Sequence, residues 1–129
     1  PIFSPLSMLE TQEEWESERI GCGCPPVRTK DGWLVVYHGV SGKDQAYRVG
    51  FVLLDSENPS KIIARTKLFV MEAEKEYEKS GLWCNCVFPT GIVEQNGILY
   101  IYYGCADTYI AVATVELQEV LDYMRQNRV

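Results

Sequence analysis

The sequence predicts an all-β fold made of two similar units and closed by one C-terminal helix. Short segments rich in β-branched and aromatic residues recur along the 129 residues, and glycine-, asparagine- or aspartate-containing turns separate them. A helical spacing of apolar residues appears only near the end of the chain, in residues 116–128. Repeats of three or four short antiparallel strands over several tens of residues are typical of β-propeller blades. The expected organisation is a polar lead-in loop with a short helical turn at 1–20, followed by a partial propeller at 21–129.

The first predicted blade covers residues 21–71. Trp33–Val40 and Ala46–Asp55 have strand composition and are joined by a glycine-containing turn. Lys61–Lys67 follows an Asn-Pro-Ser turn and is expected to be an outer strand, which Leu68–Met71 continues after a bend.

The second predicted blade covers residues 84–115 and follows a charged connector at 72–83 that has no apolar stripe. An Asn-Gly pair predicts a tight hairpin between its first two strands. The three expected strands are Asn85–Glu94, Ile98–Tyr103 and Thr108–Leu117. Two blades do not close a ring, so we expect either a homo-oligomer or a missing N-terminal half to cover the apolar flanks.

Composition and charge exclude several classes of protein. An apolar fraction of 47% is too high for a disordered chain. Nucleic acid is not an expected partner, because the net charge is −6 and the basic residues are scattered. No apolar run approaches the ~20 residues that span a bilayer, and no signal-type segment opens the sequence. We therefore expect a cytoplasmic protein with no membrane partner.

A few polar side chains are candidates for chemistry when the sequence is considered alone. His38 is the single histidine and ends an aromatic strand, a position that suits an oxyanion, although a lone histidine is more often structural. Tyr47 is typical of strand packing with a polar tip, and Arg19 of a surface charge opposite nearby glutamates. Asp107 is typical of a turn, and Asn85 of packing at the entry of a strand.

Motifs spread in order along most of the chain resemble glycoside hydrolase family 130, which contains β-mannoside phosphorylases and some mannosidases. They are Trp15-Glu16-Ser17, Arg19 to Pro26, Gly32-Trp33, Tyr37 to Val40, Tyr47 to Gly50, Leu54-Asp55, Asn58-Pro59, Ile63 to Thr66, Asn85, Phe88-Pro89 with Gly91, and Tyr102 to Gly104 with Ala106 to Thr108. The resemblance implies a five-bladed propeller with its active site at the central channel. This chain would supply about the last two blades and the closing helix.

The resemblance also implies roles for the candidate residues. His38 and Tyr47 would contact phosphate, as would Arg19, which stands where many relatives carry lysine. Asp107 would accept hydrogen bonds from sugar hydroxyls, and Asn85 would shape the wall of the substrate channel. In the family, the catalytic aspartate that donates the proton belongs to the first blades, which are expected to be absent here, so no catalytic residue is assigned.

The five cysteines leave one alternative open. They occur as Cys22-Gly-Cys24, Cys84-Asn-Cys86 and a lone Cys105, positions where the family more often has alanine, proline or valine. An odd number cannot pair completely, which favours reduced thiols. Convergence of these thiols on zinc is conceivable, but the spacing is not a standard zinc spacing and free cysteine is common as a small apolar residue. The prediction is therefore no metal and no cofactor.

The expected function is inverting phosphorolysis of a β-mannoside, which would give mannose 1-phosphate and a sugar. The partners would be a mannose-containing oligosaccharide and inorganic phosphate. The isolated chain is expected to be inactive because the acid is missing, and water could replace phosphate as acceptor. The alternative is a non-catalytic carbohydrate-binding or oligomerising propeller fragment, and a thiol-metal module is the third hypothesis.

Overall fold

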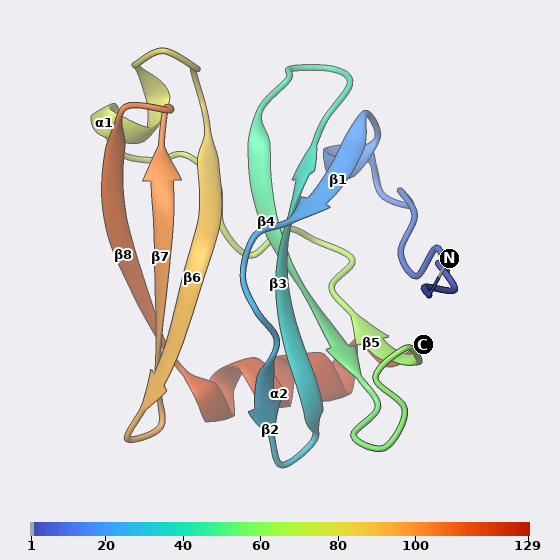
Figure 1. Cartoon of the computed structure of the whole chain (residues 1–129). Coiled ribbons are helices and arrows are strands. Elements are labelled where there is room, and N and C mark those ends of the chain that lie inside the picture. Colours follow the sequence, from blue (N-terminus) through green and yellow to red (C-terminus); the bar gives the residue numbers. More distant parts are fainter. Residues whose placement is uncertain (1) are drawn as a thin grey trace.

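The computed structural model describes residues 2–129 and contains two antiparallel sheets that stand side by side, with a helix across one end of both (Figure 1). The first sheet has the order β1-β3-β4-β5, with β2 pairing the other half of β3. Its strands are β1 (Arg19–Cys22), β2 (Val27–Thr29), β3 (Gly32–Val40), β4 (Tyr47–Leu54) and β5 (Ile62–Arg65). The second sheet has the order β6-β7-β8, with β6 (Val87–Gln95), β7 (Ile98–Cys105) and β8 (Tyr109–Glu116).

The helical elements are few and short, apart from the last one. A 3₁₀ turn, η1 (Glu14–Glu16), precedes the first sheet, and α1 (Glu76–Lys79) precedes the second. The C-terminal helix α2 (Leu117–Gln126) follows β8 directly and buries Val120, Leu121 and Met124. The prediction of an all-β fold with a C-terminal helix is confirmed.

The main core lies between the two sheets. Even-numbered side chains of β3, such as Leu34 and Val36, face Leu99 and Ile101 of β7, and all four are at most 5% exposed. Met124 of α2 closes one end of this core. The alternation of strand side chains therefore commits one face of each sheet to the contact between them.

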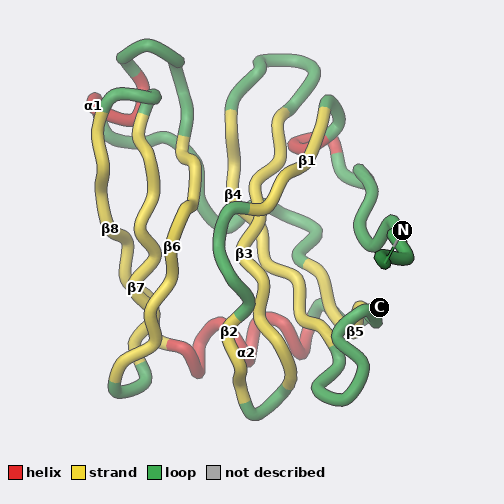
Figure 2. Tube along the Cα trace, in the orientation of Figure 1, coloured by secondary structure: helices red, strands yellow, loops and turns green. Residues whose placement is uncertain are grey.

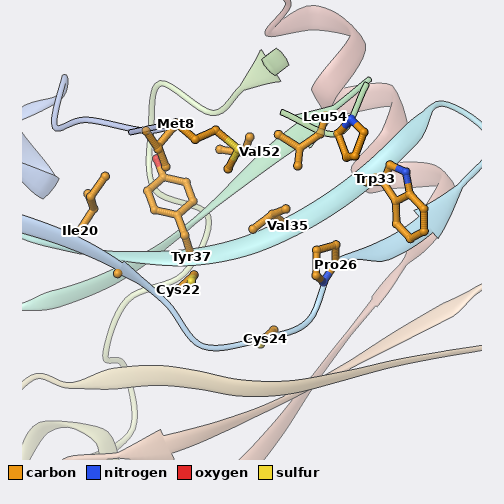
Figure 3. A pocket seen from close by; sticks show the side chains of 13 residues that line it. Met8, Ile20, Cys22, Cys24, Pro26, Trp33, Val35, Tyr37, Val52 and Leu54 are labelled. Carbon is orange, nitrogen blue, oxygen red and sulfur yellow. The ribbon is translucent and has the colours of Figure 1, made fainter. Parts of the chain in front are cut away.

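The opposite face of the first sheet, which carries the odd-numbered side chains of β3, has a second, smaller apolar cluster formed by Trp15, Tyr37, Val52 and neighbours. This face borders an open apolar hollow of about 670 Å³, whose lining includes Met8 and Trp33 (Figure 3).

Two predictions about the strands were wrong. Arg19 and Ile20, expected to end the lead-in loop, begin strand β1, which pairs with the end of β3. Leu68–Met71 does not continue the outer strand and makes only an isolated bridge between Val49 and Met71. The pairing of β4 with the outer strand ends here because the Phe51 N–H donates to the Thr66 hydroxyl and not to a backbone carbonyl.

The charged segment after β5 contains a feature that its composition did not indicate. Glu78 in α1 is only 3% exposed, and its carboxylate accepts hydrogen bonds from the Tyr103 hydroxyl and from the N–H groups of Glu74 and Lys75. This arrangement, in which a glutamate of a short helix holds a tyrosine of a central strand, is called a glutamate latch below.

A matching latch precedes the first sheet. Glu16 in η1 is fully buried and accepts hydrogen bonds from the Tyr37 hydroxyl (2.8 Å), from Arg65 and from the N–H groups of Gln12 and Glu13. Both latches come from a Glu-aromatic-Glu motif, at 14–16 and at 76–78. The same arrangement of a short helical turn followed by an antiparallel sheet therefore occurs twice in the chain.

Candidate functional site

Arg19, His38 and Tyr47 lie together near the turn that joins β3 to β4. This turn is at the end of the sheets opposite α2 (Figure 2). The strand register explains why the three residues are close, because Val40 of β3 pairs with Arg19 of β1 on one side and with Tyr47 of β4 on the other. Arg19 donates a hydrogen bond of 3.0 Å to the Tyr47 hydroxyl, and its guanidinium lies 5.5 Å from the centre of the Tyr47 ring. The His38 and Tyr47 ring centres are 5.4 Å apart. The three residues predicted to bind phosphate therefore form one cluster.

His38 is the buried member of this cluster, with 7% of its surface exposed. Its Nδ1 is buried and has no hydrogen-bond partner among residues 2–129. Burial, and secondarily the Arg19 charge, lowers the pKa of His38 below its usual value, so the ring is neutral at pH 7. The ring packs on Gly21, where an added Cβ would lie 2.7 Å from it.

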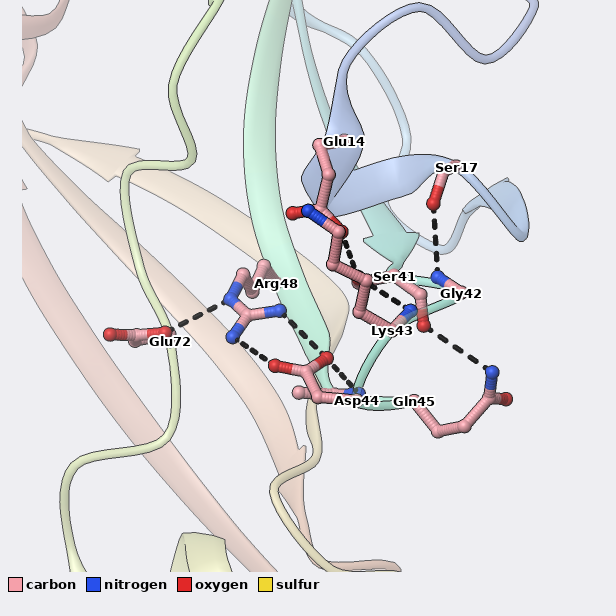
Figure 4. Close-up of polar contacts among 10 residues, drawn as sticks. Glu14, Ser17, Ser41, Gly42, Lys43, Asp44, Gln45, Arg48 and Glu72 are labelled. Carbon is pink, nitrogen blue, oxygen red and sulfur yellow. Dashed lines mark hydrogen bonds and ion pairs between the residues drawn. The ribbon is translucent and has the colours of Figure 1, made fainter.

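Arg19 is the arginine of this region whose charge is least committed to partners. Its one carboxylate neighbour is Glu18, at 4.0 Å, and both side chains are nearly half exposed. By contrast, Arg48 binds Asp44 at 2.7 Å and Glu72 at 2.9 Å (Figure 4), and Arg65 belongs to the Glu16 latch. An anion at this end of the sheets would therefore find Arg19 available.

The turn between β3 and β4 is fixed from both sides, which holds Tyr47 in place (Figure 4). On one side, the Ser41 hydroxyl donates to Glu14 (2.7 Å) and the Gly42 N–H donates to the Ser17 hydroxyl (3.0 Å). On the other side, Arg48 bridges the turn residue Asp44 to the connector through Glu72. The Tyr47 N–H is also bound, by the Asn85 carbonyl at 2.9 Å.

The second sheet completes the site with aromatic side chains. Phe88 of β6 lies 4.4 Å from His38 and 6.0 Å from Tyr47 between ring centres. Trp83, in the loop before β6, meets the Tyr47 ring edge-on at 6.2 Å and 86°. The three members of the cluster belong to the first sheet and contact aromatic residues of the second, so the cluster lies at the seam between the two sheets.

The predicted sugar-binding residues lie next to this seam but are less tightly joined to it. Asn85 has a positive φ of 52° and touches the cluster through its backbone carbonyl. Asp107 is exposed in the turn between β7 and β8, and its carboxylate makes no hydrogen bond within residues 2–129. Burial raises the pKa of Cys86 to about 11, and the negative charge of the nearby Asp107 contributes to this increase.

The cysteines do not gather into a metal centre. All five are free; Cys22 and Cys84 are exposed, whereas Cys24, Cys86 and Cys105 are buried. Burial raises the pKa of Cys24 to about 11, so this thiol stays protonated at neutral pH. No group of three His, Cys, Asp or Glu side chains in residues 2–129 could hold a metal ion. The thiol-metal hypothesis therefore has no support in the described part of the chain.

Sequence reasoning missed Trp83 and Gly21 at this site. Trp83 falls at the end of the predicted charged connector, and its position just before a predicted strand is the one signal that the sequence contains. The closeness of Gly21 to His38 depends on the pairing of β1 with β3, which the predicted lead-in loop left out.

None of the helices described in residues 2–129 is both long and apolar enough to cross a membrane.

Comparison with known proteins decides the family. The profile of glycoside hydrolase family 130, described as β-1,4-mannooligosaccharide phosphorylase, matches residues 2–126. The chain belongs to glycoside hydrolase family 130. Similar family 130 proteins include a β-1,2-mannobiose phosphorylase of Thermoanaerobacter sp. strain X514, 49% identical over 88% of this chain. A 1,2-β-oligomannan phosphorylase of the same strain is 44% identical over 93% of this chain.

A solved structure of family 130 gives the fold. The β-1,2-mannobiose phosphorylase of Listeria innocua, in complex with β-1,2-mannobiose, superposes with a TM-score of 0.83 at 36% identity over 88% of this chain. The chain corresponds to 37% and 38% of the two Thermoanaerobacter proteins and to 32% of the Listeria structure. The two sheets are therefore two blades of a five-bladed propeller, followed by its C-terminal helix.

Proposed function

We propose that this chain supplies the phosphate-binding part and some of the sugar-binding part of a β-mannoside phosphorylase active site. The observation that carries the proposal is the cluster of Arg19, His38 and Tyr47 at the seam between the blades. Similarity to phosphorylases that act on β-1,2- and β-1,4-mannosides supports the substrate class.

The chemistry of the cluster suits a phosphate ion. Arg19 offers planar N–H donors for charge-assisted hydrogen bonds, and the Tyr47 hydroxyl can donate once Arg19 turns to the anion. A neutral His38 still has one N–H to donate, and its buried Nδ1 is free of other partners among the described residues. Phosphate has enough acceptor oxygens to bind all three donors at once.

In the proposed reaction, a phosphate oxygen forms a bond to the anomeric carbon while the glycosidic carbon–oxygen bond breaks. An acid protonates the departing oxygen, and the products are mannose 1-phosphate and the shortened sugar, with inversion at the anomeric carbon. Asp107 and Asn85 would bind sugar hydroxyls. We assign no acid to this chain, and we propose that it is inactive alone because it spans little more than a third of its relatives. Release of mannose 1-phosphate by the purified chain would contradict that part.

A second candidate function is non-catalytic carbohydrate binding or assembly. It is favoured by the open apolar hollow beside Tyr37 and Val52 and by exposed apolar residues on the far face of the second blade. We propose that a second copy, or the rest of a longer protein, covers these faces. The five free cysteines support a reducing, cytoplasmic setting for either function.

The phosphate proposal predicts a selective loss of phosphate binding when Arg19 is replaced. Calorimetric titration of the purified chain with inorganic phosphate would compare the unmodified chain with Arg19→Met. Loss of one charge-assisted contact should weaken binding by about 10- to 100-fold, since such bonds contribute about 1.5–3 kcal/mol.

A matched control is available in the same blade. Arg28 also lies over an aromatic ring, that of Trp33 at 5.0 Å, but on β2, away from the cluster. Arg28→Met should leave phosphate binding within about twofold. Equal affinities of the two variants, or no phosphate binding by the unmodified chain, would overturn the proposal.

A further inference from the structure

Trp83 combines an exposed aromatic surface with a fixed position beside the phosphate cluster. Its side chain is 46% exposed, although its ring edge contacts Tyr47. Single exposed aromatic residues are common on proteins and need no explanation by themselves. Trp83 differs from such residues because it lies directly beside the phosphate cluster.

The loop that carries Trp83 is held firmly against the turn that carries Asp107. The Trp83 N–H donates to the Ala106 carbonyl at 3.0 Å, and the Leu82 N–H donates to the Thr108 hydroxyl at 3.1 Å. Gly81 approaches this turn so closely that an added Cβ would lie 2.5 Å from the Ala106 oxygen. Trp83 is thus backed by the Asp107 turn on one side and contacts Tyr47 on the other.

A sugar that reacts with bound phosphate must lie at this place. The attacking oxygen and the anomeric carbon have to come within ~3–3.5 Å of each other, so the reacting pyranose ring borders the phosphate cluster. A mannose ring has an apolar C–H face and a rim of hydroxyls. An aromatic ring suits the first, and an exposed carboxylate such as Asp107 suits the second.

We propose that Trp83 is a stacking platform for the mannose ring next to the bound phosphate. The inference rests on the proposed function and adds a positioning residue for its sugar substrate. It differs from a purely structural role, in which the indole would serve only to pack Tyr47 and would affect phosphate and sugar alike.

The test compares Trp83→Ala and Trp83→Phe in the full 129-residue chain, using β-1,2-mannobiose and inorganic phosphate as probes. We expect Trp83→Ala to weaken mannobiose binding about tenfold while phosphate affinity stays within about twofold. Trp83→Phe should keep most of the sugar affinity, because a ring face remains. Leu82→Ala is the matched control, since Leu82 is the exposed neighbour (82%) and should change neither affinity.

A spectroscopic readout adds a second test. Trp15 is only 5% exposed, but Trp33 is half-buried at the open hollow, so the acrylamide quenching that belongs to Trp83 is the difference between the unmodified chain and Trp83→Phe. Mannobiose should reduce the quenching in the unmodified chain and not in Trp83→Phe.

Each outcome bears on the proposal. Unchanged mannobiose binding by Trp83→Ala overturns the stacking platform and leaves the phosphate proposal standing. The same conclusion follows if the unmodified chain binds phosphate but not mannobiose. An equal loss of both affinities assigns Trp83 to packing and also overturns the platform. Failure of the unmodified chain to bind either probe overturns the proposed function and this inference with it.

Discussion

His38 shows how a single residue can be prepared for a ligand at a cost to the free protein. Its ring is buried against Gly21 and Phe88, and its Nδ1 has no partner within residues 2–129. A buried nitrogen without a hydrogen bond is unfavourable, by about 1–3 kcal/mol in mutational data. The other ring nitrogen, Nε2, is not among the buried unpaired atoms, and it is the one from which an incoming anion could accept a hydrogen bond.

The pKa of His38 gives a direct prediction, because this is the one histidine in the sequence. Proton NMR of its ring should give a pKa below 6.5 in the free chain, since burial and Arg19 both disfavour the charged form. Saturating phosphate should move that pKa upward, because a nearby anion favours the protonated ring. A free-chain pKa at or above 6.5 would contradict the buried, neutral state.

The same shift fixes the direction of a stability change with pH. Above pH ~6.5 the histidine is neutral in both the folded and the unfolded chain, so it adds no pH dependence. As the pH falls below that value, the unfolded chain binds a proton that the folded chain does not. Stability should therefore decrease on acidification until the folded pKa is passed. Replacement of His38 by phenylalanine should flatten this part of the profile.

The elements that sequence could predict are those whose pattern is long and local. Strand β3, for example, has nine residues dominated by β-branched and aromatic side chains and is bounded by glycine-containing turns. Strand β1 and helix α1 have only four residues each, too few for a periodic signal. Their formation depends on partners far along the chain, such as Tyr103 for Glu78.

Part of the candidate site could likewise be predicted from the sequence, and part could not. The grouping of Arg19, His38 and Tyr47 was expected from family resemblance, because the motifs around them match the family. The place of Trp83 depends on how its loop docks on the Asp107 turn, and no local pattern contains that information. Propensity and spacing describe single elements, whereas a site at a seam is made by their packing.

The glutamate latches give a prediction for an element, because each one fastens a short helix to a strand. Burial raises the pKa of Glu78, but hydrogen bonds from Tyr103 and from two backbone N–H groups outweigh it, so the net pKa lies below the usual value. Tyr103→Phe should cost about 1–3 kcal/mol of unfolding free energy at pH 7, measured by urea denaturation.

The latch should also determine the acid sensitivity of the fold. Glu78 contributes stability above its unfolded pKa of ~4.3, and this contribution is lost as the pH falls through its lower folded pKa. Removal of the Tyr103 hydroxyl raises the folded pKa, so the variant should begin to lose this contribution at a higher pH. Tyr102→Phe, on the same strand but 42% exposed, is the control. Equal stability of the two variants would show that the latch does not hold α1.

At the scale of the whole molecule, the two blades leave two apolar faces uncovered. One is the hollow of about 670 Å³ beside Tyr37 and Val52 (Figure 3). The other is the face of the second sheet that points away from the core, where Tyr102, Ile110 and Val112 are 42%, 84% and 48% exposed. A blade normally buries both faces against neighbours, so these are the surfaces where further blades or another copy would pack.

The uncovered faces predict that the purified 129-residue chain associates with itself. Light scattering over a range of concentrations should show a mass that rises above the 14.7 kDa of one chain. Ile110→Lys should shift the molecule toward the monomer, because a charge on this face would have to lose its hydration on contact. Glu57→Gln changes the net charge by the same amount on an exposed turn and should leave association unchanged, which separates a local effect from a general one. A mass of one chain at every concentration would mean that the exposed faces do not drive assembly, and that this blade pair is stable without its neighbours.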